Sequence, residues 1–296
     1  MSPFAPDRPV RFRHLRTPEE FQETERIQTS AWGLVEERPV PHPLQRAMED
    51  NGGLLLGAFE DERLVGFCLG FLGREDDRLF HYSHMTAVRP EVQNQHLGFR
   101  LKVYQREEVL KQRLSEIRWT YDPLQSRNAF LNVRRLGARP EVYHIRYYGT
   151  MGSEINRGLE TDRLRVSWAL TSAMVQERID GRYPTPEQDR ARVGESQPLV
   201  LTEPHPSGVR TPASAAEPSQ PTVQIEVPIE LARVRELAPD AVPLWREATR
   251  RAFRSSLGAG YRVDDFAVIT RGAERRGYYL LSLPPHVGRD RAPSAG

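Results

Sequence analysis

The sequence predicts a mixed sheet with helices on its faces, followed by a smaller α+β unit. Apolar segments with strand and helix periodicity alternate over residues 10–148 in the order β-α-α-β-β-β-α-β-α-β, which is typical of α/β and α+β folds. A stretch rich in Pro, Ser and Ala interrupts this pattern at 184–222. The 296 residues are 38% hydrophobic, which is enough for a buried core but low for a chain that is globular throughout.

The N-terminal elements have clear boundaries. Residues 10–15 alternate polar and apolar side chains and predict a strand. Thr17 offers an N-cap, Pro18 suits the first helical position, and two glutamates follow as a capping box. A helix should therefore run to Trp32 and end at the glycine after it. A short second helix is expected near 43–50.

The next segments complete the sheet. Two apolar runs separated by four charged residues predict a hairpin, and apolar residues at helical spacing after Leu97 predict a long helix. The expected elements are a hairpin at 54–59 and 64–72, strands at 80–88 and 117–121, helices at 97–115 and 126–136, and an extended segment at 142–148.

The composition divides the chain into four parts. Residues 1–160 hold the first sheet, and 161–183 are expected to be a connecting strand and helix. The proline-rich segment 184–222 has too little apolar surface to offset its ordering entropy, so we expect a mobile linker with a short docked strand at 199–201. Residues 223–296 then form a C-terminal α+β domain, with a strand at 223–227, a helix at 243–257 and strands at 261–270 and 278–283.

Composition and charge exclude several classes of protein. A net charge of +2 gives no electrostatic reason to bind nucleic acid. Cys68 is the only cysteine, which excludes an intrachain disulfide and a cysteine-based zinc site. The first residues lack the apolar segment of a signal peptide, and no run reaches the roughly 18 apolar residues of a membrane span. We therefore expect a cytoplasmic protein with no nucleic-acid partner, no membrane partner and no metal.

The most informative segment is 87–101, in which a strand ends at a proline, a polar turn follows, and a helix begins near Gly98. The first N–H groups of a helix have no acceptor within the helix and lie at the positive end of its dipole. Such a turn can bind a diphosphate through the main chain. A plain strand–turn–helix connection is the alternative interpretation.

This segment resembles the acetyl-CoA loop of the GCN5-related N-acetyltransferase (GNAT) superfamily. That loop reads Gln/Arg-x-x-Gly-x-Gly/Ala after a strand ending in Val-x-Pro, and Gln93, His96 and Gly98 fall on its three marked positions, with Val88 in place before them. His96 replaces the usual glycine, and if this position needs a positive φ the replacement costs on the order of 1 kcal/mol. The order of elements given above is also that of the superfamily.

The resemblance implies a mostly antiparallel, twisted sheet and acetyl-CoA, or another acyl-CoA, as the co-substrate. The Asp-Pro-Leu, Asn-Ala and Leu-Gly runs within 122–137 are similar to those of a poorly characterised bacterial branch. The unit at 223–296 shares only its closing order of elements with the family, and is either a degenerate GNAT-like half or an added lid. The implied cofactor-binding residues are Val88, Gln93, Asn94, Gln95, His96, Leu97, Gly98, Phe99 and Asn128.

Acyl transfer to an amine needs a polarised thioester carbonyl, a deprotonated amine and a proton for the leaving thiolate. In the family, a backbone N–H near Val88 would serve the first need. A tyrosine often serves the third, but its expected position holds Val133. Asp122 is the candidate base or ammonium anchor, and Tyr143 and Tyr148 are candidate acids. Each has a structural alternative, Asp122 as a turn cap and the tyrosines as aromatics packed in a sheet.

Two functions follow from the resemblance. The first is an acetyl-CoA-dependent N-acetyltransferase in which an amine of a small molecule or peptide attacks the thioester directly, since the only cysteine lies away from the loop. The second is a CoA-binding or ligand-sensing protein without catalysis, which the missing tyrosine and the replaced glycine favour. The sequence leaves open the acceptor, the acyl-chain preference and whether the protein forms a homodimer.

Overall fold

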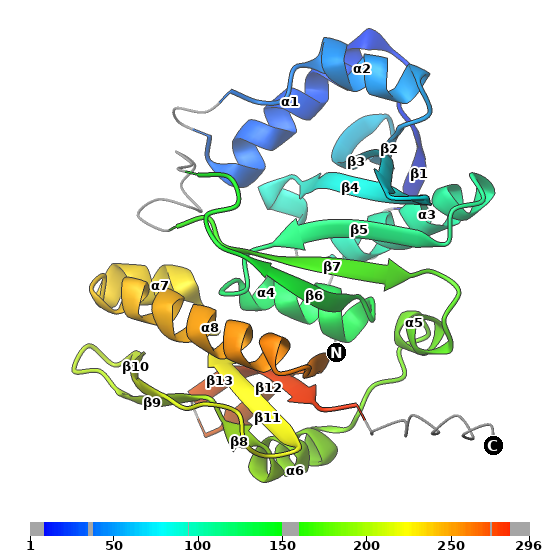
Figure 1. Ribbon diagram of the computed structural model, residues 1–296. Coiled ribbons are helices and arrows are strands. Elements are labelled where there is room, and N and C mark those ends of the chain that lie inside the picture. Colours follow the sequence, from blue (N-terminus) through cyan, green and yellow to red (C-terminus); the bar gives the residue numbers. More distant parts are fainter. Residues whose placement is uncertain (1–8, 35–37, 94, 150–159, 273, 285–296) are drawn as a thin grey trace, which may run out of the picture.

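The protein contains two sheet units that lie one above the other (Figure 1). The computed structural model describes residues 9–34, 38–93, 95–149, 160–272 and 274–284. Within them, a seven-stranded sheet precedes a four-stranded sheet, and a separate two-stranded ribbon accompanies the second. The predicted fold class, a mixed and mainly antiparallel sheet flanked by helices with an additional C-terminal sheet unit, is confirmed.

The first sheet has the strand order β1-β2-β3-β4-β5-β7-β6, and only β4 and β5 are parallel neighbours in it. Its strands are β1 (Val10–His14), β2 (Leu54–Glu60), β3 (Arg63–Glu75), β4 (Arg78–Val88), β5 (Glu116–Tyr121), β6 (Arg139–His144) and β7 (Arg163–Ala169). Its helices are α1 (Pro18–Trp32), α2 (His42–Asp50), α3 (Leu97–Lys111) and α4 (Ser126–Ala129). The 3-10 turn η1 (Pro90–Val92) precedes α3, and the π-helical turn η2 (Phe130–Arg135) follows α4.

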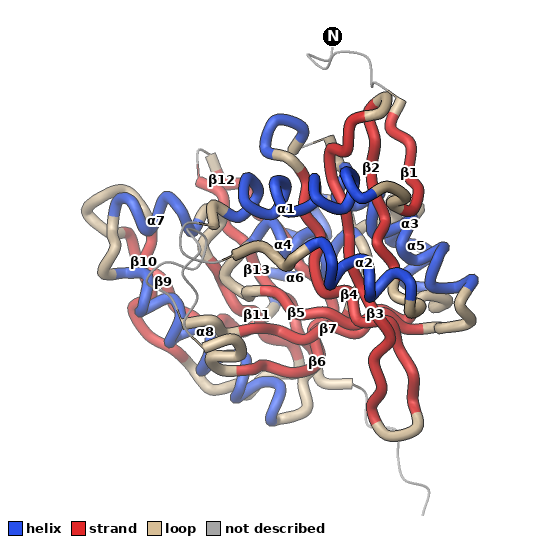
Figure 2. Tube along the Cα trace, turned by 90° about the horizontal axis from the view of Figure 1, so that it is seen from above, coloured by secondary structure: helices blue, strands red, loops and turns tan. Residues whose placement is uncertain are grey.

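The alternation of side chains along β2 places helices on both faces of the first sheet. Leu56 packs in one apolar cluster with Leu101 of α3, whereas Leu55 packs in another with Phe21 of α1. Figure 2 shows α1 and α2 crossing the strands on one side. The hydroxyl of Thr17 caps α1, as the sequence predicts.

Strands β4 and β5 separate soon after they meet. Only His81 and Tyr82 of β4 have partners in β5, although β4 continues to Val88. At the point of separation, the register of β4 against β3 shifts around His84, which is an extra residue on β4. Because such a bulge bends its own strand, it directs the end of β4 away from β5.

The C-terminal unit is a second sheet covered by one long helix, α8, which also contacts β6 of the first sheet (Figure 1). The strand order is β12-β13-β11-β8, and β10 pairs with β9 in the ribbon. Among the described residues no helix is long and apolar enough to cross a membrane. The remaining elements are α5 (Ala173–Ile179), α6 (Pro186–Glu195), β8 (Gln197–Pro198), β9 (Val200–Pro204), β10 (Arg210–Ala215), β11 (Thr222–Val227), α7 (Leu231–Leu237), α8 (Ala241–Gly258), β12 (Arg262–Arg271) and β13 (Glu274–Ser282).

The expectation that 184–222 is a mobile linker is wrong, because this segment forms α6, β8, β9 and β10. Thr185 begins α6 with a capping box, and β8 pairs with β11. Leu199 and Val200 are buried in a core cluster shared with the C-terminal unit. Tertiary partners thus supply the apolar burial that the segment's own composition lacks. Strand β7 lies in the segment 161–183, which was expected to connect the two units, and it belongs to the first sheet. The borders of the domains stay a prediction.

Three other elements differ in extent from the sequence expectation. The helix expected at 126–136 begins as α4 but continues as a π-helical turn, in which Leu136 N–H donates to Leu131 O. The helix expected at 97–115 ends at Lys111. The extended segment expected at 142–148 ends at His144, so that Tyr148 lies in the loop after β6.

A buried ion pair joins the two units. Arg246 of α8 donates two hydrogen bonds of 2.8 Å to the carboxylate of Asp122, which follows β5, and both side chains are 4% exposed. Beside this pair, the hydroxyl of Tyr279 donates to the main-chain oxygen of Pro123 at 2.9 Å. The C-terminal unit therefore fixes the chain where β5 leads into α4.

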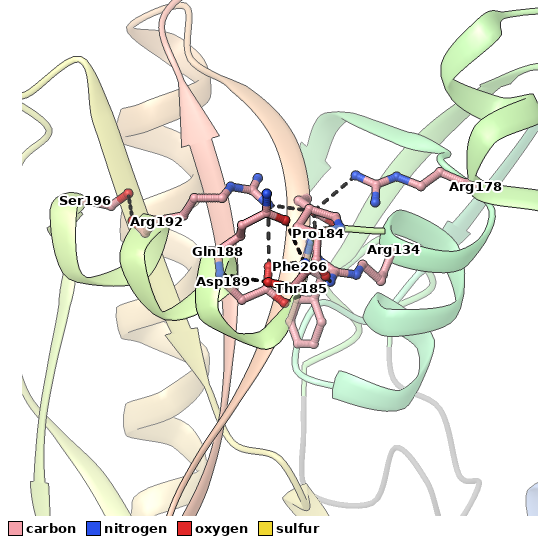
Figure 3. A network of polar contacts seen from close by, with 10 residues as sticks. Arg134, Arg178, Pro184, Thr185, Gln188, Asp189, Arg192, Ser196 and Phe266 are labelled. Carbon is pink, nitrogen blue, oxygen red and sulfur yellow. Dashed lines mark hydrogen bonds and ion pairs between the residues drawn. The ribbon is translucent and has the colours of Figure 1, made fainter. Parts of the chain in front are cut away.

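A second buried network is centred on Asp265 of β12, whose side chain is fully buried. Figure 3 shows the three arginines of this network, Arg134, Arg178 and Arg192. Asp265 Oδ2 accepts from Arg134 of η2 at 2.8 Å, from Arg192 of α6 at 2.9 Å and from Arg178 of α5 at 3.1 Å. Asp189 of α6 accepts two further hydrogen bonds from Arg134, at 3.0 and 2.8 Å. These charges connect the end of the first sheet unit to the second sheet.

Replacement of Asp265 by Asn should strongly destabilise the protein, because three arginines would lose the carboxylate that they share. Loss of one partner from a buried ion pair costs about 3–5 kcal/mol. Urea unfolding measures the free energy of unfolding. The matched control is Glu217→Gln, which removes an exposed partner of Arg251 and should change that energy by less than about 0.5 kcal/mol. Equal stability of the two variants would contradict a central role for Asp265.

Candidate functional site

A groove of about 890 Å³ opens where β4 and β5 separate. Its walls come from the ends of these strands, the turn before α3, the first turn of α3, α4 with η2, and α7 of the C-terminal unit. Gln95 is exposed and is not among the lining residues, and Asn94 lies outside the described residues. The other residues that the sequence predicts for cofactor binding all line the groove, and their binding role stays a prediction; they are Val88, Gln93, His96, Leu97, Gly98, Phe99 and Asn128.

The first turn of α3 presents main-chain donors to the groove. Arg100 N–H donates to His96 O at 3.0 Å and makes the first hydrogen bond of the helix. The N–H groups of Leu97, Gly98 and Phe99 therefore have no acceptor in the helix. Among the described residues no side chain caps this helix, and His96 before it has a left-handed φ of 58°. The positive φ considered for His96 from the sequence is confirmed.

Gln93 and two arginines from the opposite wall surround these donors. Gln93 Nε2 donates to Val88 O at 3.2 Å, and Arg127 Nη1 of α4 donates to Gln93 Oε1 at 3.3 Å. Arg135 Nη1 of η2 lies 3.2 Å from His96 Nδ1. Free N–H groups and two guanidinium groups at one end of the groove suit an anion such as a diphosphate.

The end of β4 has an open edge that faces the groove. Arg89 N–H donates to Val65 O of β3 at 2.9 Å. Since main-chain groups alternate in direction along an extended strand, the N–H and C=O of Val88 point to the other edge, toward β5. No pairing with β5 occurs beyond Tyr82 in the described part of β4. An extended ligand with amide groups can pair with such an edge as an added strand would.

The C-terminal unit contributes to the site. Leu231, Ala232 and Arg235 of α7 line the groove together with residues of the first sheet unit. The sequence did not indicate whether this unit reaches the site. In the structure, α7 is one of its walls.

Two of the residues predicted for catalysis have structural partners away from the groove. The carboxylate of Asp122 accepts from Leu124 N–H at 2.9 Å in addition to Arg246, which agrees with its interpretation as a turn cap. The hydroxyl of Tyr143 donates to Asp162 at 2.7 Å, and burial raises the pKa of this tyrosine further above its ordinary value. Neither side chain lines the groove.

The third, Tyr148, remains close to the site. Its side chain is exposed in the loop after β6, and its hydroxyl lies 3.2 Å from Oγ1 of Thr120. Thr120 itself lines the groove. Tyr148 therefore stays a candidate at the edge of the site. Asp122 and Tyr143 instead form hydrogen bonds with other parts of the protein, outside the groove.

The groove also contains a lysine that the sequence analysis did not assign to the site. Lys102 of α3 lies one helical turn after Gly98, is 4% exposed and lines the groove. Its Nζ donates to Ser83 Oγ at 2.8 Å and to Gln105 Oε1 at 3.1 Å. The same ammonium nitrogen lies 3.9 Å from the ring centroid of Trp119 of β5. Of these groups, Ser83, Lys102 and Trp119 line the groove where β4 and β5 separate.

A buried polar network continues from Lys102 into the sheet. Ser83 Oγ donates to Gln105 Oε1 at 3.0 Å, and Gln105 Nε2 lies 3.1 Å from His81 Nε2. Burial, reinforced by the nearby Lys102, lowers the pKa of His81 to about 3, so the ring is neutral and its Nε2 can accept from the Gln105 amide. Gly70 of β3 is required here, because a Cβ atom would collide with the His81 ring.

Lys102 changes charge near neutral pH. Burial lowers its pKa from 10.5 to about 7. Burial also raises the pKa of the adjacent Cys68 to about 12, which keeps that thiol protonated and uncharged. No carboxylate forms an ion pair with Lys102 in the part of the chain that the structure describes. The charge of Lys102 is therefore stabilised by dipoles and by the Trp119 ring alone.

Helical spacing contained a signal for Lys102 that sequence reasoning did not use. Leu97, Leu101 and Val109 define the buried stripe of α3, and Lys102 falls on that stripe. A lysine on a buried face is rare enough to need an explanation. Arg127 and Arg135 gave no such signal, because their position depends on how α4 and η2 lie against α3.

The fold and groove define a mixed α/β protein with a groove beside an open strand edge. Residues 17–132 match the model of the acetyltransferase (GNAT) family. This match confirms, for these residues, the resemblance drawn from the loop before α3. The C-terminal unit lies outside the matched residues, and the comparison with curated proteins gave no match.

Several solved structures are similar to about half of the chain. The ribosomal-protein-S18-alanine N-acetyltransferase from Escherichia coli is 15% identical, with a TM-score of 0.44 over 55% of this chain and 96% of that chain. A putative acetyltransferase from Salmonella typhimurium with its cofactor acetyl-CoA is 16% identical, with a TM-score of 0.45 over 55% and 96%. The ribosomal-protein-alanine N-acetyltransferase from Brucella melitensis is 17% identical, with a TM-score of 0.44 over 53% and 97%.

Replacement of Lys102 by Met should change stability in a pH-dependent way. Because the folded-state pKa of Lys102 is lowered to about 7, the unfolded chain binds more protons between about pH 7 and 10.5, and wild-type stability rises over that range. The free energy of unfolding of Lys102→Met relative to wild type should therefore be highest at pH 6 and fall by a few kcal/mol toward pH 10. Urea unfolding at several pH values measures this difference.

Lys111→Met is the control for this experiment, because Lys111 is the other lysine of the chain and is exposed at the end of the same helix. This variant removes an exposed ammonium in place of a buried one, so it should lack the pH-dependent change in stability expected for Lys102→Met. A pH-independent difference for Lys102→Met as well would show that Lys102 titrates normally.

Proposed function

We propose that the protein is an acetyl-CoA-dependent N-acetyltransferase that transfers the acetyl group to an amine of a small molecule or peptide by direct attack. The groove is the observation that carries the proposal. One end has the free N–H groups of α3 with Arg127 and Arg135, and suits a diphosphate. The open edge of β4 continues from there into the gap, and suits an extended arm with amide groups.

Direct attack on the thioester agrees with the chemistry of the chain. Cys68 is fully buried in β3, and burial raises its pKa to about 12, so it has no thiolate form to act as a nucleophile. The main-chain N–H at the end of β4, near Val88, is a donor that can polarise the thioester carbonyl. The amine can therefore attack the carbonyl carbon without a covalent enzyme intermediate.

The second candidate is a CoA-binding protein without catalysis. One observation favours it: Val133, at the position where the family often has a tyrosine, is a buried core residue of η2 and does not line the groove. The two candidates share the nucleotide site and differ only in turnover. Binding and turnover must therefore be tested separately.

Acetyl-CoA and CoA should each raise the melting temperature, and Gly98→Asp should remove most of that increase. A ligand at 100 times its dissociation constant stabilises the fold by about 2.7 kcal/mol, a shift of several degrees. The added carboxylate would repel the diphosphate and weaken binding roughly 10- to 100-fold. It should not unfold the protein, because an acidic side chain at a helix N-terminus is favourable. Differential scanning fluorimetry with each ligand measures the effect.

Gly98→Ala is the matched control for binding. A Cβ atom on Gly98 would meet only Leu131, at 4.0 Å, and the family accepts alanine at this position. The alanine variant should keep most of the ligand-induced shift. An undiminished shift in Gly98→Asp would place the diphosphate elsewhere, and absence of a shift in the wild type would reject both candidate functions.

Turnover should appear as release of the CoA thiol in the presence of an acceptor. We expect at least one class within a panel of peptide N-termini, lysine side chains and small primary amines to increase thiol release from acetyl-CoA, as measured with a thiol reagent. Gly98→Asp provides the control for release that does not depend on the groove. Ligand binding without thiol release on any amine would support the CoA-binding candidate.

A further inference from the structure

We propose that Lys102 protonates the departing thiolate when the acetyl group is transferred. This inference rests on the proposed function and identifies the source of a proton that the family resemblance leaves without a donor. Val133 occupies the position of the usual tyrosine and is buried in the core. Neither Asp122 nor Tyr143 lines the groove, whereas Lys102 does.

The position of Lys102 fits this role. It follows Gly98 by four residues, so it lies about 6 Å further along the same face of α3. Its side chain extends from the helix into the gap, where Nζ contacts Ser83 of β4 and the ring of Trp119 of β5. A ligand that binds its diphosphate at Gly98 and extends along the open edge of β4 enters this gap with its other end.

The contacts of Lys102 favour its charged form. Two of its N–H groups donate to oxygen acceptors, Ser83 Oγ and Gln105 Oε1, and the third side of the ammonium faces the aromatic ring of Trp119. A ring face attracts a cation and offers nothing to the lone pair of a neutral amine. The groups thus hold an ammonium ready to donate, while its burial makes the proton easy to lose.

The proposed step balances in atoms and charge. The acceptor ammonium first loses a proton to water, and its nitrogen lone pair then forms the C–N bond to the thioester carbonyl carbon. When the C–S bond breaks, its electron pair goes to sulfur, and Lys102 gives one proton to that sulfur. The neutral amine of Lys102 then takes the proton that the new amide nitrogen must lose. Lys102 ends the cycle charged, as it began.

His84 of β4 and Tyr121 of β5 also line the groove, but burial lowers the pKa of His84 and raises that of Tyr121, so neither titrates near neutral pH as Lys102 does. Cys68 of β3 is protonated and uncharged, and His81 of β4 is neutral. The other residues in contact with Lys102 are Ser83, Gln105 and Trp119 of β5, and none of their side chains titrates. Within the described residues, Lys102 forms no ion pair with a carboxylate, and its hydrogen bonds go to Ser83 and Gln105.

The chain allows a direct test, because Lys102 and Lys111 are its only lysines. In protein labelled with isotopic lysine, NMR should resolve two side-chain signals, and the signal of Lys102 should titrate near 7. The titration is repeated with CoA and with desulfo-CoA, which lacks only the sulfur. We expect the pKa of Lys102 to stay near 7 in both complexes, because a sulfur that has received the proton is an uncharged thiol.

Two variants complete the experiment. Bound to the wild type or to Lys111→Met, CoA should show no ultraviolet absorbance of a thiolate at neutral pH, because Lys102 supplies the proton of the thiol. On an amine accepted by the wild type, Lys102→Met should lower kcat at least about 100-fold, with little change in the affinity for desulfo-CoA. The NMR comparison uses wild-type protein and stands even if a variant fails to fold.

The outcomes separate this inference from the function on which it rests. If both ligands bind but only CoA, bound as a thiolate, raises the pKa of Lys102, the lysine keeps its proton, and the proton donor is a different group while the CoA site stands. A pKa of Lys102 near the ordinary lysine value in the free protein also overturns the inference. If neither ligand binds, the proposed function fails, and this role of Lys102 fails with it.

Discussion

The separation of β4 from β5 is the constraint on which the rest of the site depends. Unpaired main-chain groups are costly when buried, so the part of β4 from Ser83 to Val88 requires either a neighbouring strand or an open surface. The bulge at His84 provides the open surface by bending β4 away. The same gap exposes the first turn of α3 and Lys102. Had β5 paired with β4 to its end, the sheet would have closed over both, and no groove would exist between them.

The C-terminal unit keeps the opposite wall of this gap in place. Arg134 and Arg135 are neighbours on η2, yet Arg134 points into the buried network around Asp265 while Arg135 lies beside His96 in the groove. The wide π-helical turn that carries them is a known feature of functional sites. Because Arg134 is held by charges from α6 and β12, the direction of Arg135 follows from packing between the units. The groove is therefore a product of both units, although the family match covers only the first.

The sequence predicted those parts of the fold that local patterns specify. Thr17 and Gly98 mark helix starts through short-range rules, and the hairpin of β2 and β3 follows from period-two alternation. The segment 184–222 could not be predicted, because its order comes from partners such as β11 that are distant in sequence. For the site, the loop could be recognised from its spacing. The choice between a catalytic base and a turn cap for Asp122 could not be made from the sequence, because its partner Arg246 lies 124 residues later, on α8.

Lys102 shows why a residue of the site can be overlooked when it lies among the buried apolar residues of a helix. A leucine or methionine at this place would pack against Trp119 and avoid the cost of burying an ammonium, so stability alone does not explain a lysine. The surroundings reduce that cost only in part: they provide two oxygen acceptors and an aromatic face, but no carboxylate that would hold the proton firmly. A carboxylate partner would have raised the pKa and fixed the charge. Burial lowers the pKa of Lys102, whereas the two oxygen acceptors and the aromatic ring stabilise its charged form. A group that transfers protons needs both effects, because it must first give up a proton and then regain one.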